Sequence, residues 1–280
     1  MRPPASGGPR DPESGGAYTH GHHESVLRSH RWRTADNSAG YLLPLLRPGM
    51  RLLDVGCGPG TITMDLADRV GPSGSVTALE RTEDALDLGR AEARRRGTAN
   101  VSFVVADAQD LGLPDDGFDV VHAHQVLQHL PHPVRALREM RRVCRPGGVV
   151  AVRDSDYAGF TWWPEVPGLD RWLDLYRRVA RSNGAEPDAG RRLLSWALAA
   201  GFADVTPGAA TWCYATPEER AWWGGLWAER VVASDLARQA VDRGLATTED
   251  LESIAAAWRR WSAQEDGWFS VLHGQLLARG

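Results

Sequence analysis

The sequence of 280 residues contains no lysine, so all 32 of its Lys-plus-Arg side chains are arginines. A P-loop requires a lysine, and so does the Schiff base of most pyridoxal phosphate enzymes, so neither chemistry is expected. Only three cysteines are present, and they form no CxxC pair and no disulfide framework. We therefore expect a reduced, cytoplasmic protein without a metal site built on Cys57, Cys144 or Cys213.

The chain also lacks a strong charge bias and a long apolar run. Its formal charge is −4 and no arginine block stands out, so no nucleic-acid partner is expected. No apolar run reaches the roughly 18 residues of a membrane-spanning helix. Residues 1–17 are rich in Pro, Gly and Ser without an apolar core, which argues against a secretory signal and predicts a disordered tail.

The chain is organised around residues 51–61, which read Arg-Leu-Leu-Asp-Val-Gly-Cys-Gly-Pro-Gly-Thr. The apolar residues predict a strand, and the glycines predict a turn that a ligand can approach closely. Pro59 suits the first turn of a helix, which we expect over 61–70. A helix N-terminus after such a turn is typical of nucleotide-type sites. The spacing differs from the dinucleotide fingerprint G-x-G-x-x-G, because Thr61 occupies the third glycine position.

Residues 53–60, Leu-Asp-Val-Gly-Cys-Gly-Pro-Gly, resemble motif I of the class I S-adenosylmethionine (SAM) methyltransferases. The stretch from Phe118 to Leu130 and the R-P-G-G turn at 145–148 are also similar to this family. The segment 29–33 resembles the one before motif I in methyltransferases of the ubiquinone/menaquinone-biosynthesis type. The resemblance implies SAM as cofactor, bound partly by the motif I residues Asp54, Gly56, Cys57, Gly58, Gly60 and Thr61.

Acidic residues follow the next two predicted strands. The strand 76–80 ends at Glu80, whose carboxylate can accept hydrogen bonds from both ribose hydroxyls, and Arg81 follows it. A third strand is expected over 101–108. The resemblance makes Asp107 the acceptor for the adenine amino group and places the Ala108 N–H near the ring. Because ligands of parallel sheets bind at the carboxyl ends of the strands, these residues predict one site.

The fourth and fifth predicted strands, 118–124 and 149–155, bring further polar side chains to the same edge. His124, Gln125 and His129 are candidate cofactor contacts, although His129 can equally cap or line a helix. His124, His129, Asp154 and Asp156 are candidate bases if the acceptor needs deprotonation. The [DN]-P-P-[YF] motif of DNA- or glutamine-directed methyltransferases is replaced by His-Gln-Val-Leu at 124–127, which argues against those substrates.

Residues 18–33 precede the sheet and contain four histidines, His20, His22, His23 and His30. Without nearby cysteines this pattern is weak for zinc, and we expect no metal. We expect instead a segment that folds over the ligand, with Tyr18 and Arg33 as cofactor contacts. A helix is then predicted over 37–46.

Eleven of the twelve tryptophans lie in the second half of the chain, between Trp162 and Trp268. Most are expected in a core, and a few in an apolar acceptor pocket. We expect strands over 203–214, with a bulge at Gly208, and over 268–278. Helical insertions at about 158–190 and 216–265 would form a substrate lid. The aromatic surface can also serve a homodimer interface.

The overall prediction is a Rossmann-like α/β domain with a seven-stranded, mostly parallel sheet, an antiparallel last strand and helices on both faces. Residues 18–157 would form the SAM-binding core, and 158–280 the remainder of the same domain. The predicted function is methyl transfer to O, N or C of a small-molecule acceptor. An NAD-dependent oxidoreductase and a non-catalytic SAM-binding protein remain as alternatives.

Overall fold

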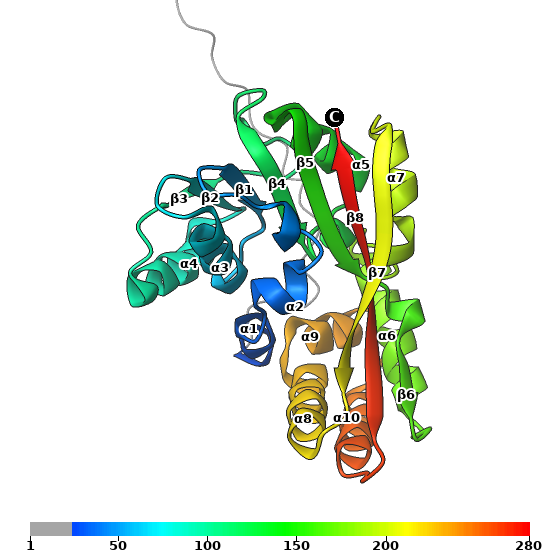
Figure 1. Cartoon of the computed structure of the whole chain (residues 1–280). Coiled ribbons are helices and arrows are strands. Elements are labelled where there is room, and N and C mark those ends of the chain that lie inside the picture. Colours follow the sequence, from blue (N-terminus) through cyan, green and yellow to red (C-terminus); the bar gives the residue numbers. More distant parts are fainter. Residues whose placement is uncertain (1–23) are drawn as a thin grey trace, which may run out of the picture.

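The computed structural model describes residues 24–280 and contains one mixed sheet in that range (Figure 1). The predicted tail and Tyr18 lie outside the described residues. The strand order is β3-β2-β1-β4-β5-β8-β6, with β7 paired to the other side of β8. The strands are β1 Arg51–Val55, β2 Ser75–Glu80, β3 Val101–Val105, β4 Phe118–His124, β5 Cys144–Ser155, β6 Thr161–Trp163, β7 Asp204–Tyr214 and β8 Trp268–Arg279.

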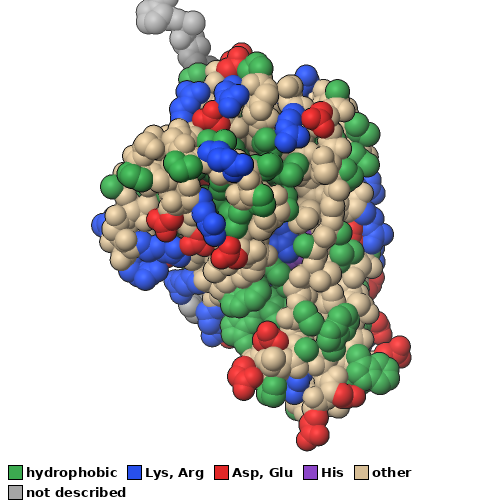
Figure 2. Space-filling view, in the orientation of Figure 1, with side chains coloured by type: hydrophobic (Ala, Val, Ile, Leu, Met, Phe, Trp, Pro, Cys, Tyr) green, Lys and Arg blue, Asp and Glu red, His purple; other side chains and the backbone are tan. Residues whose placement is uncertain are grey.

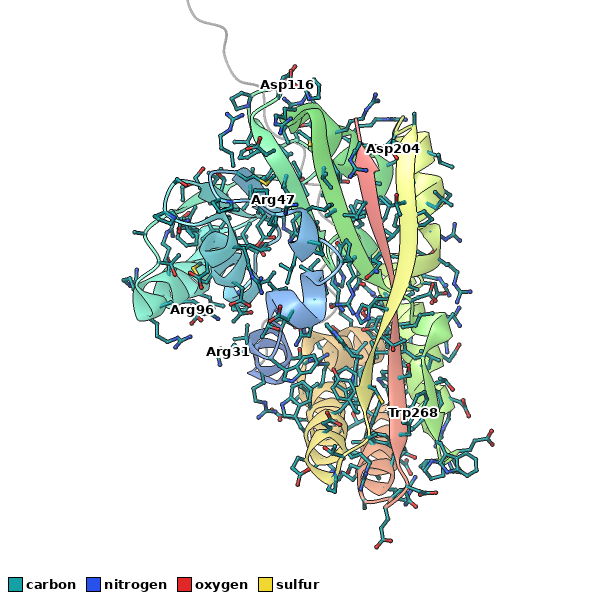
Figure 3. All side chains as sticks on the ribbon, viewed as in Figure 1. Arg31, Arg47, Arg96, Asp116, Asp204 and Trp268 are labelled. Atoms are coloured by element: carbon teal, nitrogen blue, oxygen red, sulfur yellow. The ribbon has the colours of Figure 1, made fainter. Side chains whose placement is uncertain are left out.

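Strands β1 to β5 are parallel, and β8 runs antiparallel to β5, β6 and β7. The predicted Rossmann-like sheet with an antiparallel last strand is therefore confirmed. The described residues form one strand more than the seven expected, because the three-residue strand β6 pairs with the start of β8. Figure 3 shows Asp204 and Trp268 near opposite ends of the long β7–β8 ladder.

Helices surround the sheet and connect its strands. The α-helices are α1 Glu24–Arg31, α2 Ala35–Ala39, α3 Thr61–Val70, α4 Glu83–Arg96, α5 Pro133–Val143, α6 Leu169–Ser182, α7 Leu193–Ala199, α8 Pro217–Ala233, α9 Asp235–Asp242 and α10 Thr248–Ser262. Short 3₁₀ turns are η1 Leu43–Leu45, η2 Leu127–His129, η3 Tyr157–Gly159 and η4 Gly190–Arg192.

Because successive side chains of a strand point to opposite faces of the sheet, neighbouring residues show which helices cover each face. Leu53 and Val121 pack with residues of α5 and α7 in one apolar cluster. Leu52 and Val120, one residue away on the same strands, pack with residues of α2 and α3 in another cluster. Helix α4 joins this second face through Leu86. The core strands are thus covered on both sides, as a parallel sheet requires.

In the lower half of Figure 1, helices α6, α8, α9 and α10 lie beside β7 and β8. Their side chains form a separate aromatic cluster. Trp172 of α6 contacts the Trp227 and Trp258 rings edge to face, at centroid distances of 4.6 and 4.8 Å. Phe269 of β8 lies among these rings. Most of the tryptophans in the second half therefore fill a core. Figure 2 shows hydrophobic side chains gathered in the lower half of one face, with acidic side chains around its lower end.

Three expected elements differ in the structure. The helix predicted over 37–46 splits into α2 and η1, because Pro44 has no N–H to donate to the carbonyl four residues earlier. The third strand ends at Val105 rather than at Ala108. The turn expected at 145–148 is instead part of β5. The pairing of β4 with β5 is irregular nearby, where its register shifts between Phe118 and Val120.

The bulge expected at Gly208 is wrong, because β7 and β8 pair in unbroken register from Asp204↔Arg279 to Tyr214↔Phe269. Gly208 instead lies against the Gln275 side chain, whose Nε2 atom would be 3.1 Å from an added Cβ.

A close backbone contact joins η4 to β8 at Gly190 and Gly274. A Cβ on Gly274 would collide with the Gly190 carbonyl, and a Cβ on Gly190 would lie 2.6 Å from the Gly274 nitrogen. This approach places the Arg191 N–H 2.8 Å from the Asp156 carboxylate. The contact therefore ties the end of β5 to the segment that follows α6.

Gly274→Ala should reduce the free energy of unfolding by about 1–3 kcal/mol, because the added methyl overpacks a backbone contact. Gly225→Ala is the matched control, since Gly225 is an exposed position of helix α8 and nothing lies within 4 Å of the new methyl. That change should be neutral or stabilise by about 0.5–1 kcal/mol. Urea unfolding measures both, and equal effects of the two substitutions would contradict the contact.

Candidate active site

The glycine turn, residues 56–60, connects β1 to α3 through left-handed backbone. Gly56, Gly58 and Gly60 have φ values of 70°, 53° and 81°, a region that favours glycine. The N–H groups of Gly56 and Cys57 both donate to the Leu79 carbonyl of β2, at 2.8 and 3.0 Å. A Cβ on Gly60 would lie 3.1 Å from the Cα atom of Gly89, so α4 packs directly on the turn.

Glu80 and Asp107 lie at neighbouring strand ends beside this turn. One Glu80 carboxylate oxygen accepts the Gly58 N–H at 2.9 Å, and the other accepts the Arg81 N–H at 3.1 Å. Asp107 follows β3, where its carboxylate accepts the Gln109 N–H at 2.8 Å in a local turn. Both side chains, Arg81 and Ala108 contribute to the wall of one cavity.

Asp54 lies deeper than the other motif residues and is 3% exposed. Its carboxylate oxygens are bonded to His122 Nδ1 at 2.7 Å and to the Thr63 hydroxyl at 2.6 Å. Thr61 donates its hydroxyl to the His30 carbonyl at 3.3 Å. Asp54 therefore links β1, β4 and α3 beneath the glycine turn while still contributing to the cavity wall.

Gln125 occupies a left-handed conformation, φ 55°, directly after β4. For a residue other than glycine this backbone is strained, and such strain is typical of functional sites. Its Oε1 accepts from Arg33 at 2.6 Å, and its Nε2 reaches Ser155 Oγ and His273 Nε2, both at 2.9 Å. The side chain therefore connects the segment before β1 with β5 and β8.

His124 and His129 both contribute to the cavity wall. His124 is buried, and neither ring nitrogen has a hydrogen-bond partner among the described residues. Burial, followed by the positive charge of Arg33, holds the pKa of His124 well below its usual value. His129 Nε2 lies 3.0 Å from the Gln128 amide nitrogen. Both imidazoles are therefore neutral near neutral pH.

Asp154 and Asp156 do not contribute to the cavity wall. Asp154 is fully buried and accepts the Gln128 N–H at 3.0 Å, at the start of η2. Burial raises the pKa of Asp154 to about 8, partly offset by backbone N–H donors of 126–128. Asp156 forms an ion pair with Arg191 at 2.6 Å. This geometry favours structural roles for both carboxyls, which fix η2 and η4.

The cavity joins two parts of the fold that lie far apart in the sequence. We call the end formed by the glycine turn, Glu80 and Asp107 the glycine-turn half. The aromatic half is formed by Tyr157, Phe160, Trp212, Tyr214, Trp222, Trp223 and Trp227. Arg33 also contributes to the wall, 5.8 Å from the Trp212 ring centre. The individual aromatic residues of this wall were not predicted. Trp222, Trp223 and Trp227 have the helical spacing of ordinary core residues, and Trp212 and Tyr214 lie on a strand whose cavity-facing side the sequence does not reveal.

Within residues 24–280, no group of three or more His, Cys, Asp or Glu side chains could hold a metal ion. His20, His22 and His23 lie outside this range. No helix in the same range combines the length and apolar character needed to cross a membrane.

The pKa of His129 is lowered to about 3 by burial and, secondly, by Arg33. The unfolded chain binds a proton at this residue near pH 6.5 and the folded chain does not, so stability falls as pH drops below about 6.5. When the pH falls from about 7 to about 5, the free energy of unfolding of the wild type should therefore decrease by about 1–2 kcal/mol more than that of His129→Gln. Urea unfolding at both pH values measures this. Equal losses would mean that the folded protein protonates His129.

Comparison with known proteins places this chain in a family. Residues 46–184 match the family model described as a methyltransferase domain. An uncharacterized methyltransferase of Schizosaccharomyces pombe is 35% identical over 269 residues, spanning 93% of this chain and 95% of that protein. A ubiquinone/menaquinone biosynthesis C-methyltransferase of Ectopseudomonas mendocina is 36% identical over 175 residues, or 58% of this chain and 68% of that protein.

A solved structure of a putative methyltransferase from Bacillus halodurans has the same fold. It aligns with a TM-score of 0.55 and 20% identity over 86% of this chain and 97% of that one. The full-length relative, the family model and the fold agree with one another, and the dehydrogenase alternative is removed. The chain therefore belongs to the SAM-dependent methyltransferases, with SAM as its cofactor.

Proposed function

We propose that this methyltransferase acts on a small, partly apolar or aromatic acceptor, which binds in the aromatic half of the cavity. The observation that carries the proposal is the continuity of one cavity from the glycine turn to Trp212, Tyr214 and Trp222. Aromatic walls bury flat apolar molecules well, and a few polar groups among them orient the ligand. His124 and Gln125 provide such polar groups at the boundary between the two halves.

The residues of the glycine-turn half fit SAM. The left-handed glycines leave room for a ligand against the backbone, and an added Cβ on Gly58 would have only His30 Nδ1 nearby, at 4.0 Å. Glu80 presents a carboxylate for ribose hydroxyls, and Asp107 one for the adenine amino group. We assign Arg33, Arg81 and Ala108 as further contacts on the same wall, and Cys57, Gly60 and Thr61 as residues that shape the turn.

SAM supplies a methyl group that its sulfonium already activates, so the protein mainly holds and orients the acceptor. The His124 side chain contributes to the cavity wall, which suits contact with an acceptor group. Among the candidate bases, His124 and His129 contribute to the cavity wall, whereas Asp154 holds the backbone that carries His129. We therefore assign acceptor contact to the histidines and a positioning role to Asp154.

Titration calorimetry with SAM, S-adenosylhomocysteine and NAD tests whether the glycine-turn half binds SAM. Transfer of a labelled methyl group to a panel of phenols, amines and activated carbons tests whether the aromatic half binds an acceptor. We expect binding of the two SAM-type ligands without NAD, and transfer to at least one aromatic acceptor. Binding of SAM without transfer to any acceptor class would favour the alternative of a non-catalytic SAM-binding protein.

Glu80→Ala should weaken SAM binding about 10–150-fold, because hydrogen bonds to a charged acceptor contribute about 1.5–3 kcal/mol. Glu83→Ala is the control, since it removes a nearby carboxylate that pairs with Arg90 on the surface of α4. Calorimetry measures both affinities, and circular dichroism verifies folding. A folded Glu80→Ala variant with wild-type affinity would remove the ribose assignment.

A further inference from the structure

Strand β7 is an edge of the sheet, and its outer side is open. It pairs with β8 over its whole length from Asp204 to Tyr214, and no other strand in residues 24–280 pairs with it. Apart from that ladder, no backbone hydrogen bond among the described residues reaches positions 204–211. Residues 206–209 are exposed, and Figure 1 shows β7 at one side of the molecule beside α7. The outward N–H and C=O groups of this stretch can therefore pair with another strand.

The features that normally protect an edge strand are few here. Exposed edges usually carry charged side chains or a bulge, which discourage pairing with another chain. In this protein the register of β7 is unbroken, and from Leu193 to Pro217 the only charged residue is Asp204, although 24% of the whole chain is charged. Asp204 pairs with Arg279 at 3.5 Å. Pro207 removes one donor from the edge, so a ladder on this strand would need support from neighbouring side chains.

Helix α7 provides such side chains. Leu193 and Ala197 are buried and belong to the same apolar cluster as Val205, so α7 packs on this end of β7. On another side of the helix, Leu194 and Leu198 lie one turn apart and are 40% and 54% exposed. The open strand edge and an exposed pair of leucines therefore belong to one continuous surface.

We propose that this surface, formed by residues 204–211 with Leu194 and Leu198, is a homodimer interface in which β7 pairs antiparallel with β7 of a second copy. Antiparallel pairing of a strand with its own copy places a two-fold axis perpendicular to the sheet, here near Gly208. Such an axis keeps the α7 helices of both copies on the same face of the joined sheet. The leucines of one copy then pack against those of the other.

A second copy fits this surface better than an extended segment of another protein. Such a segment would pair with the strand edge and leave the leucines of α7 exposed, whereas a second copy covers both. Stable dimers bury roughly 800 Å² on each partner, which is more than a short strand edge provides alone. The two Asp204 carboxylates would lie at opposite ends of the ladder, so within 193–217 no charge repels its own copy across the axis.

This interface differs from the one expected from the sequence. The tryptophan-rich surface was considered for a dimer, but most of those tryptophans are buried in the aromatic cluster. The uncharged stretch from 193 to 217 is exposed over most of its length instead.

Sedimentation equilibrium of the full chain measures the oligomeric state. Between about 1 and 100 μM, where a micromolar Kd is measurable, a concentration-dependent dimer is expected. A chain that stays monomeric over this range would overturn the proposal and would leave the edge of β7 to a segment of another protein.

Leu198→Lys and Ala209→Lys identify the surface. Each change enters the dimer twice, and Ala209 lies close to the proposed axis, where the like charges of the two copies repel each other. Each variant should raise the Kd of the dimer at least about tenfold. The matched control is Val241→Lys, which adds the same charge at a 42% exposed apolar residue of α9 and should leave the Kd unchanged.

Circular dichroism verifies that these variants fold. Dimers of wild-type stability in both folded Leu198→Lys and folded Ala209→Lys would overturn the assignment. None of the three substituted residues contributes to the cavity wall, so the result is independent of the proposed function.

Amide hydrogen exchange separates strand pairing from contact of the helices alone. In the wild type, the outward N–H groups within 204–211 should exchange more slowly at high protein concentration than at low concentration, because the ladder of the dimer protects them. In Ala209→Lys the same groups should exchange equally fast at both concentrations. Exchange in this stretch that does not depend on concentration, in a wild type that dimerises, would overturn the pairing of the two β7 strands.

Discussion

The Leu79 carbonyl, at the end of β2, accepts hydrogen bonds from both Gly56 and Cys57. This interaction fixes the glycine turn against the neighbouring strand and leaves the following N–H groups at the start of α3. The turn can be this tight only because three glycines adopt left-handed backbone and Gly89 lets α4 approach Gly60. Glu80 follows Leu79 directly, so the same strand end that holds the turn also presents the carboxylate beside it.

The second half of the chain completes the site through the long β7–β8 ladder. One end of the ladder extends the Rossmann-like sheet, and the other end carries the tryptophan cluster (Figure 1). Trp212 and Tyr214 on β7 therefore face a cavity whose other end is built from β1, β2 and β3. Because the ladder is continuous, the positions of the two halves depend on the register of β8 and on close contacts such as Gly190 with Gly274.

Patterns local in sequence predicted the glycine turn, the strands and the acidic strand ends well. Motif I and the apolar runs determine β1 to β4, and Glu80 and Asp107 lie on one cavity wall because parallel strands share an edge. Asp154 shows the limit of that argument. Its position at a strand end suggested the cavity, but the alternation of the strand directs its carboxyl to the backbone of 126–128.

Features that depend on distant contacts could not be predicted in the same way. Arg153 is one residue in an apolar strand, and only the fold shows that it lies beside Trp212, His273 and the Asn37 carbonyl. The unbroken pairing at Gly208 similarly depends on the Gln275 side chain of another strand. Pro44 indicates that α2 must end early, but the apolar spacing of residues 42–46 favoured the prediction of a longer helix.

The most direct test of the two-part cavity is a crystal structure of the complex with S-adenosylhomocysteine. The account predicts ribose hydroxyls within hydrogen-bond distance of Glu80, adenine beside Asp107, and the sulfur directed toward His124 and Trp212. A complex with S-adenosylhomocysteine bound elsewhere, or with its sulfur directed away from the aromatic half, would contradict the account.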